Sequence, residues 1–357
     1  MSDPLDTLLC RRLGCRYPII QTAMGWVARP ELVGASCNAG AFGFLAAAVL
    51  SPEQVGPAIA RVRELTRAPF GVNFHMFQPG AARIIDILIA ERVAAVSFGR
   101  GPDKTMIARL RDAGIVCVPT VGALRHARKM VELGVDMLVV QGGEGGGHTG
   151  SVASTVLLPQ VLDAVKVPVI AAGGFADGRG LAAALAYGAQ GIAMGTRFLM
   201  TRDCPVPEIT KRRYVEVSTE QIVVTTKVDG LPQRMIRNET LERIERAGGL
   251  RMLALALASA WQLSRLTGAS FGDMLAAARK MREGGELTFG QSLMAAIAPV
   301  LFQRSMLAGE PARGLLATGM VAGRLTDLPS CDELIGAIVR DARARLAALS
   351  GSPQLAA

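Results

Sequence analysis

Short apolar runs alternate with longer helix-like segments along the first 200 residues of the chain. The short runs lack polar alternation, as expected of parallel strands that are buried on both faces. The longer segments carry apolar residues at helical spacing, and several of them end at a glycine (Gly114, Gly134, Gly188), which is typical of helix C-termini. We predict eight strands, near residues 18–24, 43–47, 70–74, 94–98, 116–121, 137–141, 168–172 and 191–194, with helices such as 52–65, 104–113, 123–133 and 179–187 between them.

This rhythm predicts an α/β protein, and the count of eight strands favours a (β/α)8 TIM barrel. An open doubly wound sheet is the competing architecture. Glycines cluster directly after the sixth, seventh and eighth predicted strands, which is the catalytic face of a barrel. This placement favours the barrel.

The rhythm changes near Thr201. A strand is expected within 221–227, a charged amphipathic segment around 239–246, and apolar helical stretches at 250–266 and 289–307. The segment 334–349 resembles an ordinary amphipathic helix. We therefore predict a barrel over residues 1–200, a mainly helical C-terminal lobe over 201–310 that lids the active site, and a segment 311–357 that packs back on the barrel.

Composition narrows the class of protein. Half of the 357 residues are hydrophobic, which is too apolar for disorder, and the formal charge of +9 is spread along the chain rather than gathered in a nucleic-acid-binding arm. No run reaches the roughly 18 apolar residues of a membrane span, and the first residues lack a signal-peptide pattern. We expect a cytoplasmic enzyme with neither a nucleic-acid nor a membrane partner. The oligomeric state stays open, a homodimer included.

The cysteines give no sign of a metal centre or a disulfide framework. All six are scattered and form no CxxC pair. Cys37 and Cys117 lie in apolar segments and are expected in the core.

Two glycine-rich segments follow the last two predicted strands: AAGGFADG (171–178) and AMGTRF (193–198). A phosphate needs several converging backbone N–H groups, and glycine allows the close approach and positive φ that this requires. The loops after strands 7 and 8 are where TIM barrels bind phosphate groups. The pair of segments therefore predicts a phosphate site.

The segment QGGEGGGHTG (141–150) follows the sixth predicted strand. Its GxGxxG spacing does not indicate a Rossmann site, because no acidic residue ends the next strand. The loop instead presents one imidazole, His148, beside nearly bare backbone that leaves room for a flat ring and a substrate. Histidine titrates near neutral pH, so His148 is our candidate catalytic acid or base. One His and one Glu make a poor metal site, and none is expected.

Two more strand ends carry candidate ligands. The Met24 backbone and the Asn73 amide can supply the donors and acceptors that the polar edge of an isoalloxazine ring needs. His75 is a candidate for lining the substrate pocket, whereas His126 falls within a helix and is expected at the surface.

Four ordered motifs give the chain a family resemblance. PFGVN (69–73), QGGEGGGHTG (141–150), PVIAAGGFADG (168–178) and MGTRFL (194–199) resemble the nitronate monooxygenase, or 2-nitropropane dioxygenase-like, family, which includes flavin-dependent enoyl-ACP reductases. The similarity covers residues 10–200 and extends through LPSCDELI (328–335). It implies that FMN binds to Met24, Asn73, Gln141, Gly146, Gly147, Gly173, Gly174, Gly195 and Thr196, and that His148 is catalytic.

Departures from the family pattern point to a subgroup. The loop reads EGGGH where family members commonly read EAGGH, and the first strand ends QTAMGWVA. With KRRY (211–214) and VVTTKVDGLPQR (223–234), these segments resemble enzymes of bacterial steroid catabolism that are proposed to act on hydroindane-carboxyl-CoA thioesters. The basic residues Lys211, Arg212, Arg213, Lys227, Arg234 and Arg237 are candidates for contacting CoA phosphates. Residues 202–251 hold ten basic and eight acidic residues, so a solvated mixed-charge face is the alternative.

Three functions compete at this point. The leading hypothesis is an NAD(P)H-linked flavin reductase or dehydrogenase that acts on a C=C or CH–CH bond of an acyl-CoA, with His148 handling the proton. The second is a nitronate monooxygenase, which needs oxygen and no nicotinamide. An enoyl-ACP reductase and a non-catalytic nucleotide-binding barrel are further alternatives. The sequence shows no separate nicotinamide fold, so NAD(P)H would share the flavin pocket.

Overall fold

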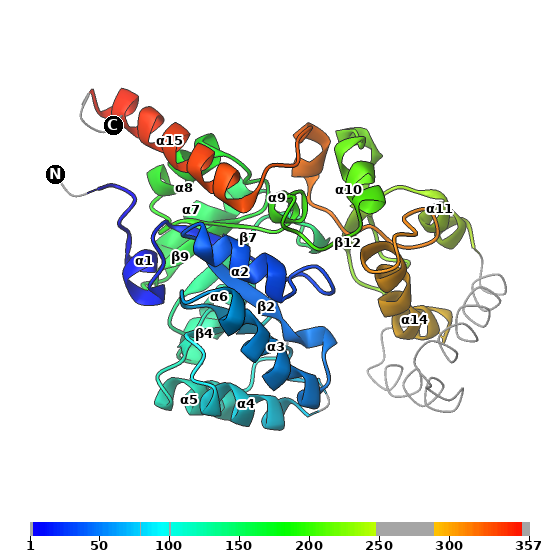
Figure 1. The fold of residues 1–357 in the computed structure, drawn as a ribbon, viewed down its shortest axis with the longest axis horizontal. Coiled ribbons are helices and arrows are strands. Elements are labelled where there is room, and N and C mark those ends of the chain that lie inside the picture. Colours follow the sequence, from blue (N-terminus) through cyan, green and yellow to red (C-terminus); the bar gives the residue numbers. More distant parts are fainter. Residues whose placement is uncertain (1–2, 79, 100, 248–288, 352–357) are drawn as a thin grey trace. The chain divides into compact units, whose positions relative to one another are not determined.

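A computed structural model describes residues 3–78, 80–99, 101–247 and 289–351 (Figure 1). The chain divides into two compact units. The barrel unit comprises Met1–Gly145, Gly150–Pro205 and Thr326–Ala357, and the second unit comprises Gly146–Thr149 and Val206–Leu325. The loop after the sixth predicted strand thus leaves the barrel unit for four residues and returns to it.

The barrel unit contains a parallel sheet with the strand order β5-β4-β3-β2-β1-β10-β9-β7-β6. Its strands are β1 (Ile19–Gln21), β2 (Phe42–Ala46), β3 (Gly71–Asn73), β4 (Ala95–Ser97), β5 (Val116–Cys117), β6 (Thr120–Val121), β7 (Leu138–Gln141), β9 (Val169–Ala172) and β10 (Ile192–Met194). Every predicted strand is confirmed, and one of them is divided into β5 and β6.

The first and last strands in this order, β5 and β6, are two halves of one continuous stretch. The N–H groups of Val116, Val118 and Thr120 donate to carbonyls of β4 and its flanking residues, at 2.8–3.1 Å. The carbonyls of Cys117 and Pro119 face the other way and accept from the N–H groups of Met137 and Val139 at 3.2 and 2.9 Å. Pro119 has no N–H to donate on that side, so the ladder is interrupted there. The sheet therefore closes into the predicted eight-stranded barrel.

Helices follow the strands around the ring. They are α1 (Leu8–Leu13), α2 (Pro30–Asn38), α3 (Pro52–Leu65), α4 (Ala81–Ala90), α5 (Lys104–Asp112), α6 (Leu124–Glu132), α7 (Ser154–Ala164), α8 (Gly178–Ala186), α9 (Thr196–Leu199) and α15 (Cys331–Ser350), with the 3-10 turn η1 (Ala47–Val49). The glycines expected at helix ends adopt positive φ, 77° at Gly114, 87° at Gly134 and 98° at Gly188. His126 is exposed on α6, as predicted.

Inward-facing strand side chains fill the barrel. The interior cluster includes Phe42 and Phe44 from β2 and Ile170 from β9, and it is joined by Leu9 and Leu13 of α1. The hydroxyl of Thr7, just before α1, donates to the carbonyl of Gln190 at 2.7 Å. Because Gln190 precedes β10, α1 lies at the amino ends of the strands. The opposite, carboxyl ends are left for the loops that carry the glycine motifs.

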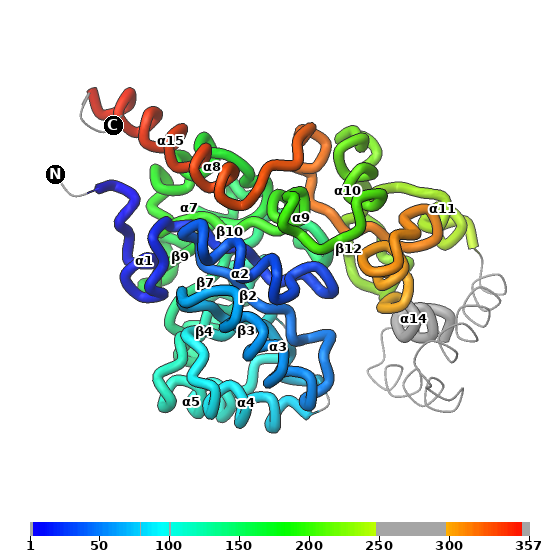
Figure 2. Tube along the Cα trace, viewed as in Figure 1, coloured from blue at the N-terminus to red at the C-terminus, as the bar shows by residue number. Residues whose placement is uncertain are grey.

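The C-terminal helix α15 packs on the barrel unit alongside α8, as the tube trace also shows (Figure 2). A Cβ on Gly178, the first residue of α8, would lie 2.5 Å from the backbone nitrogen of Ala342 and 2.6 Å from the Ile338 carbonyl oxygen. Only glycine permits this close approach between the two helices. All six cysteines of the chain are free, and Cys37 and Cys117 are buried as predicted.

The second unit is built around a three-stranded antiparallel sheet in the order β11-β12-β8. Its elements are β8 (Gly147–His148), α10 (Glu208–Val215), η2 (Thr219–Gln221), β11 (Ile222–Thr225), β12 (Gln233–Ile236), α11 (Glu239–Arg246), α14 (Phe289–Met306) and η3 (Met320–Arg324). Val228, Met235 and Leu241 are fully buried in its core.

The predicted strand within 221–227 is confirmed as β11, and α14 covers the expected helix at 289–307. The charged amphipathic segment around 239–246 forms the helix α11. The predicted helical stretch 250–266 lies outside the described residues. The described part of this unit adds a sheet that the sequence did not predict, and its role as a lid stays a prediction.

We expect Gly178→Ala to lower the free energy of unfolding by about 1–3 kcal/mol, because the new methyl group would meet backbone atoms of α15 that cannot rotate away. Gly56→Ala is the matched control. Gly56 lies inside α3, and a Cβ added there would have nothing within 4 Å, so alanine should stabilise the protein by about 0.5–1 kcal/mol. Thermal and urea denaturation of both variants measures the effect. Equal stability of Gly178→Ala and the wild-type protein would contradict this account of the α8–α15 contact.

Candidate active site

The residues predicted to bind the cofactor within the barrel unit all lie at the carboxyl ends of barrel strands. They are Met24 after β1, Asn73 at the end of β3, Gln141 at the end of β7, Gly173 and Gly174 after β9, and Gly195 and Thr196 after β10. Because the parallel strands form a closed ring, their carboxyl ends and the residues that follow them meet at one end of the barrel. TIM-barrel enzymes bind their ligands at this end.

The glycines after β9 and β10 offer unused backbone donors. Gly173 and Gly174 have φ of 94° and 83°, which turns their N–H groups away from regular strand geometry. Among the described residues, no hydrogen bond leads from the N–H groups of Gly173, Gly174 or Gly195 to another protein atom. Since β9 and β10 are paired neighbours, these donors belong to adjacent strand ends. The residues present fit a phosphate group, such as that of FMN.

Met24 lies beside this glycine edge. A Cβ on Gly195 would be 3.2 Å from Met24 Sδ and 3.0 Å from Thr22 Oγ1, so the loops after β1 and β10 approach each other closely and any side chain here would make those atoms shift. Trp26, two residues farther along, has φ of 61°. A bulky residue in the left-handed region is strained, and such strain is often found at functional sites. Nothing in the sequence pattern around Trp26 predicts this conformation.

Asn73 is held at the ends of two strands. Its Nδ2 donates to the carbonyl oxygen and to Oγ of Ser97, at 3.1 and 2.9 Å. With the amide nitrogen engaged, Oδ1 is the polar atom that Asn73 has left for a ligand, and its contact with a flavin ring stays a prediction. His75, also predicted near the pocket, is half-buried on the loop after β3 and stacks on Phe77 with 5.1 Å between ring centroids.

The first part of the glycine-rich loop is shaped by packing within the barrel unit. The Glu144 carboxylate accepts from both the backbone N–H and the hydroxyl of Ser154, at 2.8–3.1 Å, and so fixes the loop to the start of α7. A Cβ on Gly142 would lie 2.1 Å from Ser154 Oγ, and one on Gly145 would lie 2.5 Å from Gln141 Nε2. Gly142 is therefore needed for the loop to fold, because a Cβ there would also lie 2.6 Å from the Ser154 Cα, whereas a Cβ at Gly145 would require the Gln141 side chain to move.

The second part of the loop, Gly146 to His148, belongs to the second unit. A Cβ on Gly146 would lie 2.6 Å from the backbone of Thr318 and Gly319. Gly147 has φ of 63° with open space around it. Gly147 and His148 form β8, which pairs antiparallel with β12. The sequence predicted a bare loop here, and the structure instead places His148 on a sheet edge.

His148 is hydrogen-bonded to a carboxylate. Its Nε2 lies 2.6 Å from Asp229 Oδ2 and 3.1 Å from Gln233 Nε2. The His148 side chain is 48% exposed, whereas that of Asp229 is only 17% exposed. The imidazole is thus about half exposed, and its acidic partner is more deeply buried.

Asp229 and Gln233 are functional candidates that the sequence reasoning did not single out. Asp229 lies in the turn between β11 and β12, where Gly230 has φ of 83°. The Asp-Gly pair is a hairpin signal, and it stands within the VVTTKVDGLPQR segment that carried the subgroup resemblance. The hairpin was therefore predictable, but its contact with His148, 81 residues away, was not.

The predicted CoA-binding residues differ in exposure. The Lys211 side chain is only 6% exposed and its ammonium group lies 3.7 Å from Glu208. Arg212 and Arg213, on the same helix α10, are 70% and 49% exposed and lie near Glu208 and Glu216. Lys227 and Arg237 are exposed and Arg234 is half-buried. CoA binding by these residues stays a prediction.

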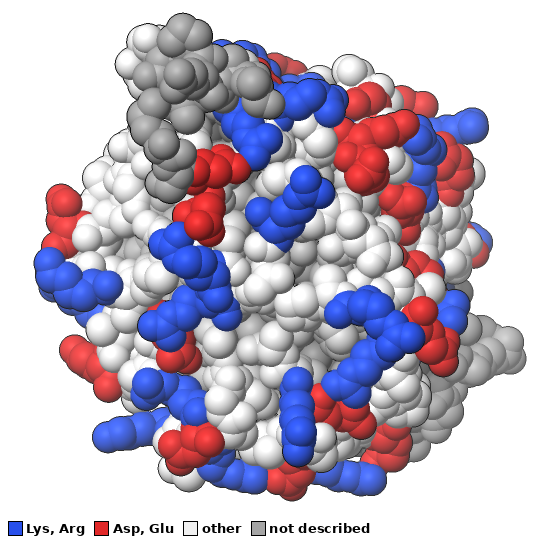
Figure 3. All heavy atoms as spheres, turned by 60° about the vertical axis from the view of Figure 1, so that its left-hand side comes forward, with Lys and Arg blue, Asp and Glu red and all other residues white. Residues whose placement is uncertain are grey.

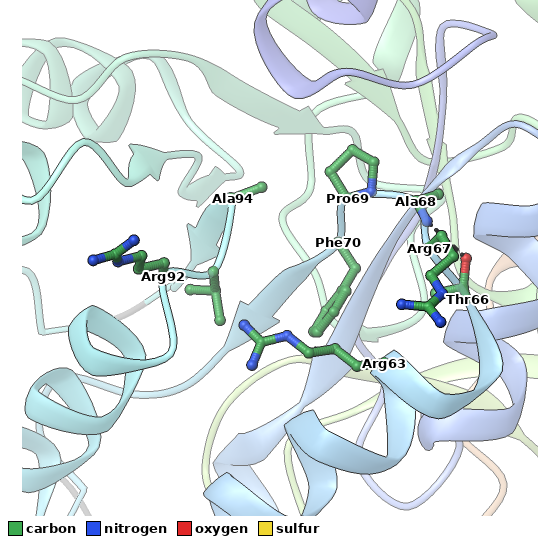
Figure 4. A pocket seen from close by; sticks show the side chains of 9 residues that line it. Arg63, Thr66, Arg67, Ala68, Pro69, Phe70, Arg92 and Ala94 are labelled. Carbon is green, nitrogen blue, oxygen red and sulfur yellow. Dashed lines mark hydrogen bonds between the residues drawn. The ribbon is translucent and has the colours of Figure 1, made fainter.

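A separate cavity of about 390 Å³ lies at the amino ends of β3 and β4 (Figure 4). Arg63, Arg67 and Arg92 line it around the ring of Phe70, and Arg63 is paired with Glu91. It lies away from the carboxyl ends of the strands, and none of the predicted site residues lines it.

On the face shown in Figure 3, basic side chains are interspersed with acidic ones. Within the described ranges, no helix is long and apolar enough to cross a membrane. The same part of the chain contains no cluster of His, Cys, Asp and Glu suited to a metal ion.

Curated proteins of similar sequence show which enzymes this chain resembles. Two curated relatives are named (3aS,4S,5R,7aS)-5-hydroxy-7a-methyl-1-oxo-octahydro-1H-indene-4-carboxyl-CoA dehydrogenase. The protein from Mycobacterium tuberculosis is 49% identical over 95% of this chain and 96% of its own. The protein from Rhodococcus jostii is 45% identical over 97% of this chain and 98% of its own. A probable nitronate monooxygenase of Staphylococcus saprophyticus is 31% identical over 67% of this chain and 81% of its own.

Solved structures agree with the barrel fold. FabK from Thermotoga maritima superposes with a TM-score of 0.78 at 29% identity, covering 97% of this chain and 98% of its own. A nitroalkane oxidase from Streptomyces ansochromogenes gives a TM-score of 0.75 at 26% identity, covering 96% and 99%. The family model described as nitronate monooxygenase matches residues 6–341. The predicted resemblance is confirmed, and the chain belongs to the nitronate monooxygenase family of flavin-dependent oxidoreductases.

Proposed function

We propose that this protein is an FMN-dependent, NAD(P)H-linked oxidoreductase that acts on the CH–CH or C=C bond next to the carbonyl of an acyl-CoA thioester. The substrate class is a steroid-derived hydroindane-carboxyl-CoA. The observation that carries this proposal is the 49% identity, over 95% of the chain, to a dehydrogenase named for such a thioester. The chemistry of the site is compatible with it, as the following residues indicate.

The barrel unit supplies the groups that would hold FMN. The N–H groups of Gly173, Gly174, Gly195 and Thr196 are assigned to the phosphate, and Met24, Asn73 and Gln141 to the ring. Gly146 and Gly147, which belong to the second unit, are also assigned to cofactor contact through their backbone. When bound, FMN accepts or returns the hydride equivalent that the substrate's β-carbon exchanges, and NAD(P)H is its proposed redox partner.

His148 handles the proton. A C–H bond next to a thioester carbonyl is acidic, so a single imidazole can remove its proton in the dehydrogenation direction or return it in the reduction direction. The exposed arginines Arg212 and Arg213, with Lys227, Arg234 and Arg237, are assigned to CoA phosphates. Lys211 is buried beside Glu208 and is assigned to holding α10 for this contact. His75 is assigned to lining the substrate pocket, and the second unit is assigned to covering the bound thioester.

A second function has specific support. The relative from Staphylococcus saprophyticus is a probable nitronate monooxygenase, and a nitronate is a small anion that the same flavin and histidine can oxidise with oxygen. The similarity to FabK likewise makes an enoyl-ACP reductase an alternative. A direct comparison of substrates distinguishes these possibilities.

The deciding experiment follows the visible flavin band of the FMN-loaded protein under anaerobic conditions. We expect NADH or NADPH to bleach the band, and the octahydroindene-carboxyl-CoA named for the relatives to bleach it without any nicotinamide. His148→Ala should keep FMN and slow the reaction with the thioester by roughly 10²–10⁴-fold. His126→Ala, an exposed histidine on α6, is the control and should react like the wild-type protein. Bleaching by propionate 3-nitronate alone would replace the proposal with nitronate oxidation.

We expect Gly174→Ala to weaken FMN binding at least tenfold, because a side chain at φ of 83° is strained and the N–H group assigned to the phosphate must shift. Gly188→Ala is the matched control. Gly188 has φ of 98° at the exposed end of α8, so it suffers similar backbone strain away from the assigned site. The ratio of flavin to protein after purification and titration of the apoprotein with FMN measure the difference. Equal loss of FMN in both variants would show that the effect is general destabilisation.

A further inference from the structure

We propose that Asp229 is a positioning residue for His148: it keeps the imidazole proton on Nε2, so that Nδ1 is the nitrogen that exchanges a proton with the substrate. The inference deepens the proposed function, because it assigns the proton transfer to one atom of His148. Its structural part, the tautomer, does not depend on the identity of the substrate.

The first observation is the geometry of the carboxylate. Asp229 Oδ2 lies 2.6 Å from His148 Nε2, while Oδ1 accepts from the backbone N–H of Leu231 at 3.1 Å. A carboxylate offers only acceptors, so the partner nitrogen must carry a hydrogen. The neutral ring then has its lone pair on Nδ1, and Nδ1 becomes its basic atom.

The state of the Asp229 carboxyl is consistent with this role. Burial alone would raise the pKa of Asp229, but hydrogen bonds from His148, from the Leu231 N–H and from Gln233, with the charge of His148, outweigh burial and hold the pKa below its usual range. Asp229 is therefore ionised at neutral pH and available as an acceptor.

Gln233 supports the Asp229 carboxylate beside the imidazole. Gln233 and His148 are register partners on β12 and β8, and the Gln233 side chain is buried. Its Nε2 lies 3.1 Å from His148 Nε2 and its amide also bonds to the Asp229 carboxylate. Two N–H donors do not bond to each other, so the carboxylate is the common acceptor of the group.

The core of the second unit fixes the position of Asp229. Val228, the preceding residue, is fully buried in the same cluster as Met235 and Leu241. The turn is closed by a hydrogen bond from the Gly230 N–H to the Thr226 carbonyl at 3.0 Å. The packed hairpin thus fixes the backbone of Asp229 and, with it, the position of the carboxylate. A catalytic imidazole needs a partner that is held in place in this way.

The proton balance follows from this arrangement. In the dehydrogenation direction, the proton of the substrate C–H bond would move to Nδ1, and the electron pair of that bond would become the new C=C bond. FMN, if held by the assigned residues, would supply the acceptor for the hydride equivalent of the neighbouring carbon. His148 then carries hydrogens on both nitrogens, and its positive charge lies beside the Asp229 carboxylate. Reduction returns the same proton from Nδ1. Removing the carboxylate would remove both the tautomer bias and the partner of this charge.

Nitrogen NMR of protein labelled with ¹⁵N-histidine tests the inference directly. The chain has three histidines, so the His148 signals can be assigned by their loss in His148→Ala. In the wild-type protein, the neutral His148 ring should show protonated Nε2 and unprotonated Nδ1. Asp229→Asn should shift the ring toward a mixture of tautomers, and it should lower kcat roughly 10²-fold with FMN binding kept and KM changed less than about threefold.

Glu239→Gln is the matched control. It removes one carboxylate from the same unit, on the exposed side of α11 where Glu239 pairs with Arg243, and it should leave the His148 signals and kcat unchanged. A wild-type ring with hydrogen on Nδ1, or a tautomer that Asp229→Asn does not alter, would overturn the inference. The wild-type spectrum alone can overturn the inference, so the test remains decisive even if a variant folds poorly. Full activity of His148→Ala would instead count against the proposed function and leave the tautomer result standing.

Discussion

The stretch from Val116 to Val121 hydrogen-bonds to β4 on one side and leads into β7 on the other, and this double pairing closes the sheet into a barrel. Closure leaves no free sheet edge, and it brings all carboxyl ends of the strands to one rim. The candidate cofactor residues of the barrel unit depend on this constraint, because they lie in short segments that are otherwise far apart along the chain. Pro119 interrupts the ladder without opening it, since the alternating carbonyls still reach β7.

Close backbone approach is the second constraint at this rim. Gly142, Gly145 and Gly195 each lie where a Cβ would meet a neighbouring side chain at 3.0 Å or less. The glycine motifs therefore serve two purposes in the same residues: they let the loops pack, and they leave bare N–H groups at the ends of β9 and β10. Glycine at these positions thus allows close packing of the loops.

Candidate functional groups lie in both units of the chain. Those of the barrel unit are mainly neutral backbone and amide groups at the ends of β3, β7, β9 and β10. The second unit contributes the titratable pair of His148 and Asp229 on its antiparallel sheet.

The sequence by itself determined the strands of the barrel, the glycine-rich segments that follow β7, β9 and β10, and the candidate histidine, because these features are local. A buried parallel strand, a helix that ends at glycine and a glycine-rich segment can each be recognised within about ten consecutive residues. Only the tertiary structure decided that His148 sits on a sheet edge, that Asp229 is its partner, and that Lys211 is buried beside Glu208. The contact between His148 and Asp229 joins residues 81 positions apart, and no local pattern encodes which distant carboxylate a hairpin will bring to an imidazole.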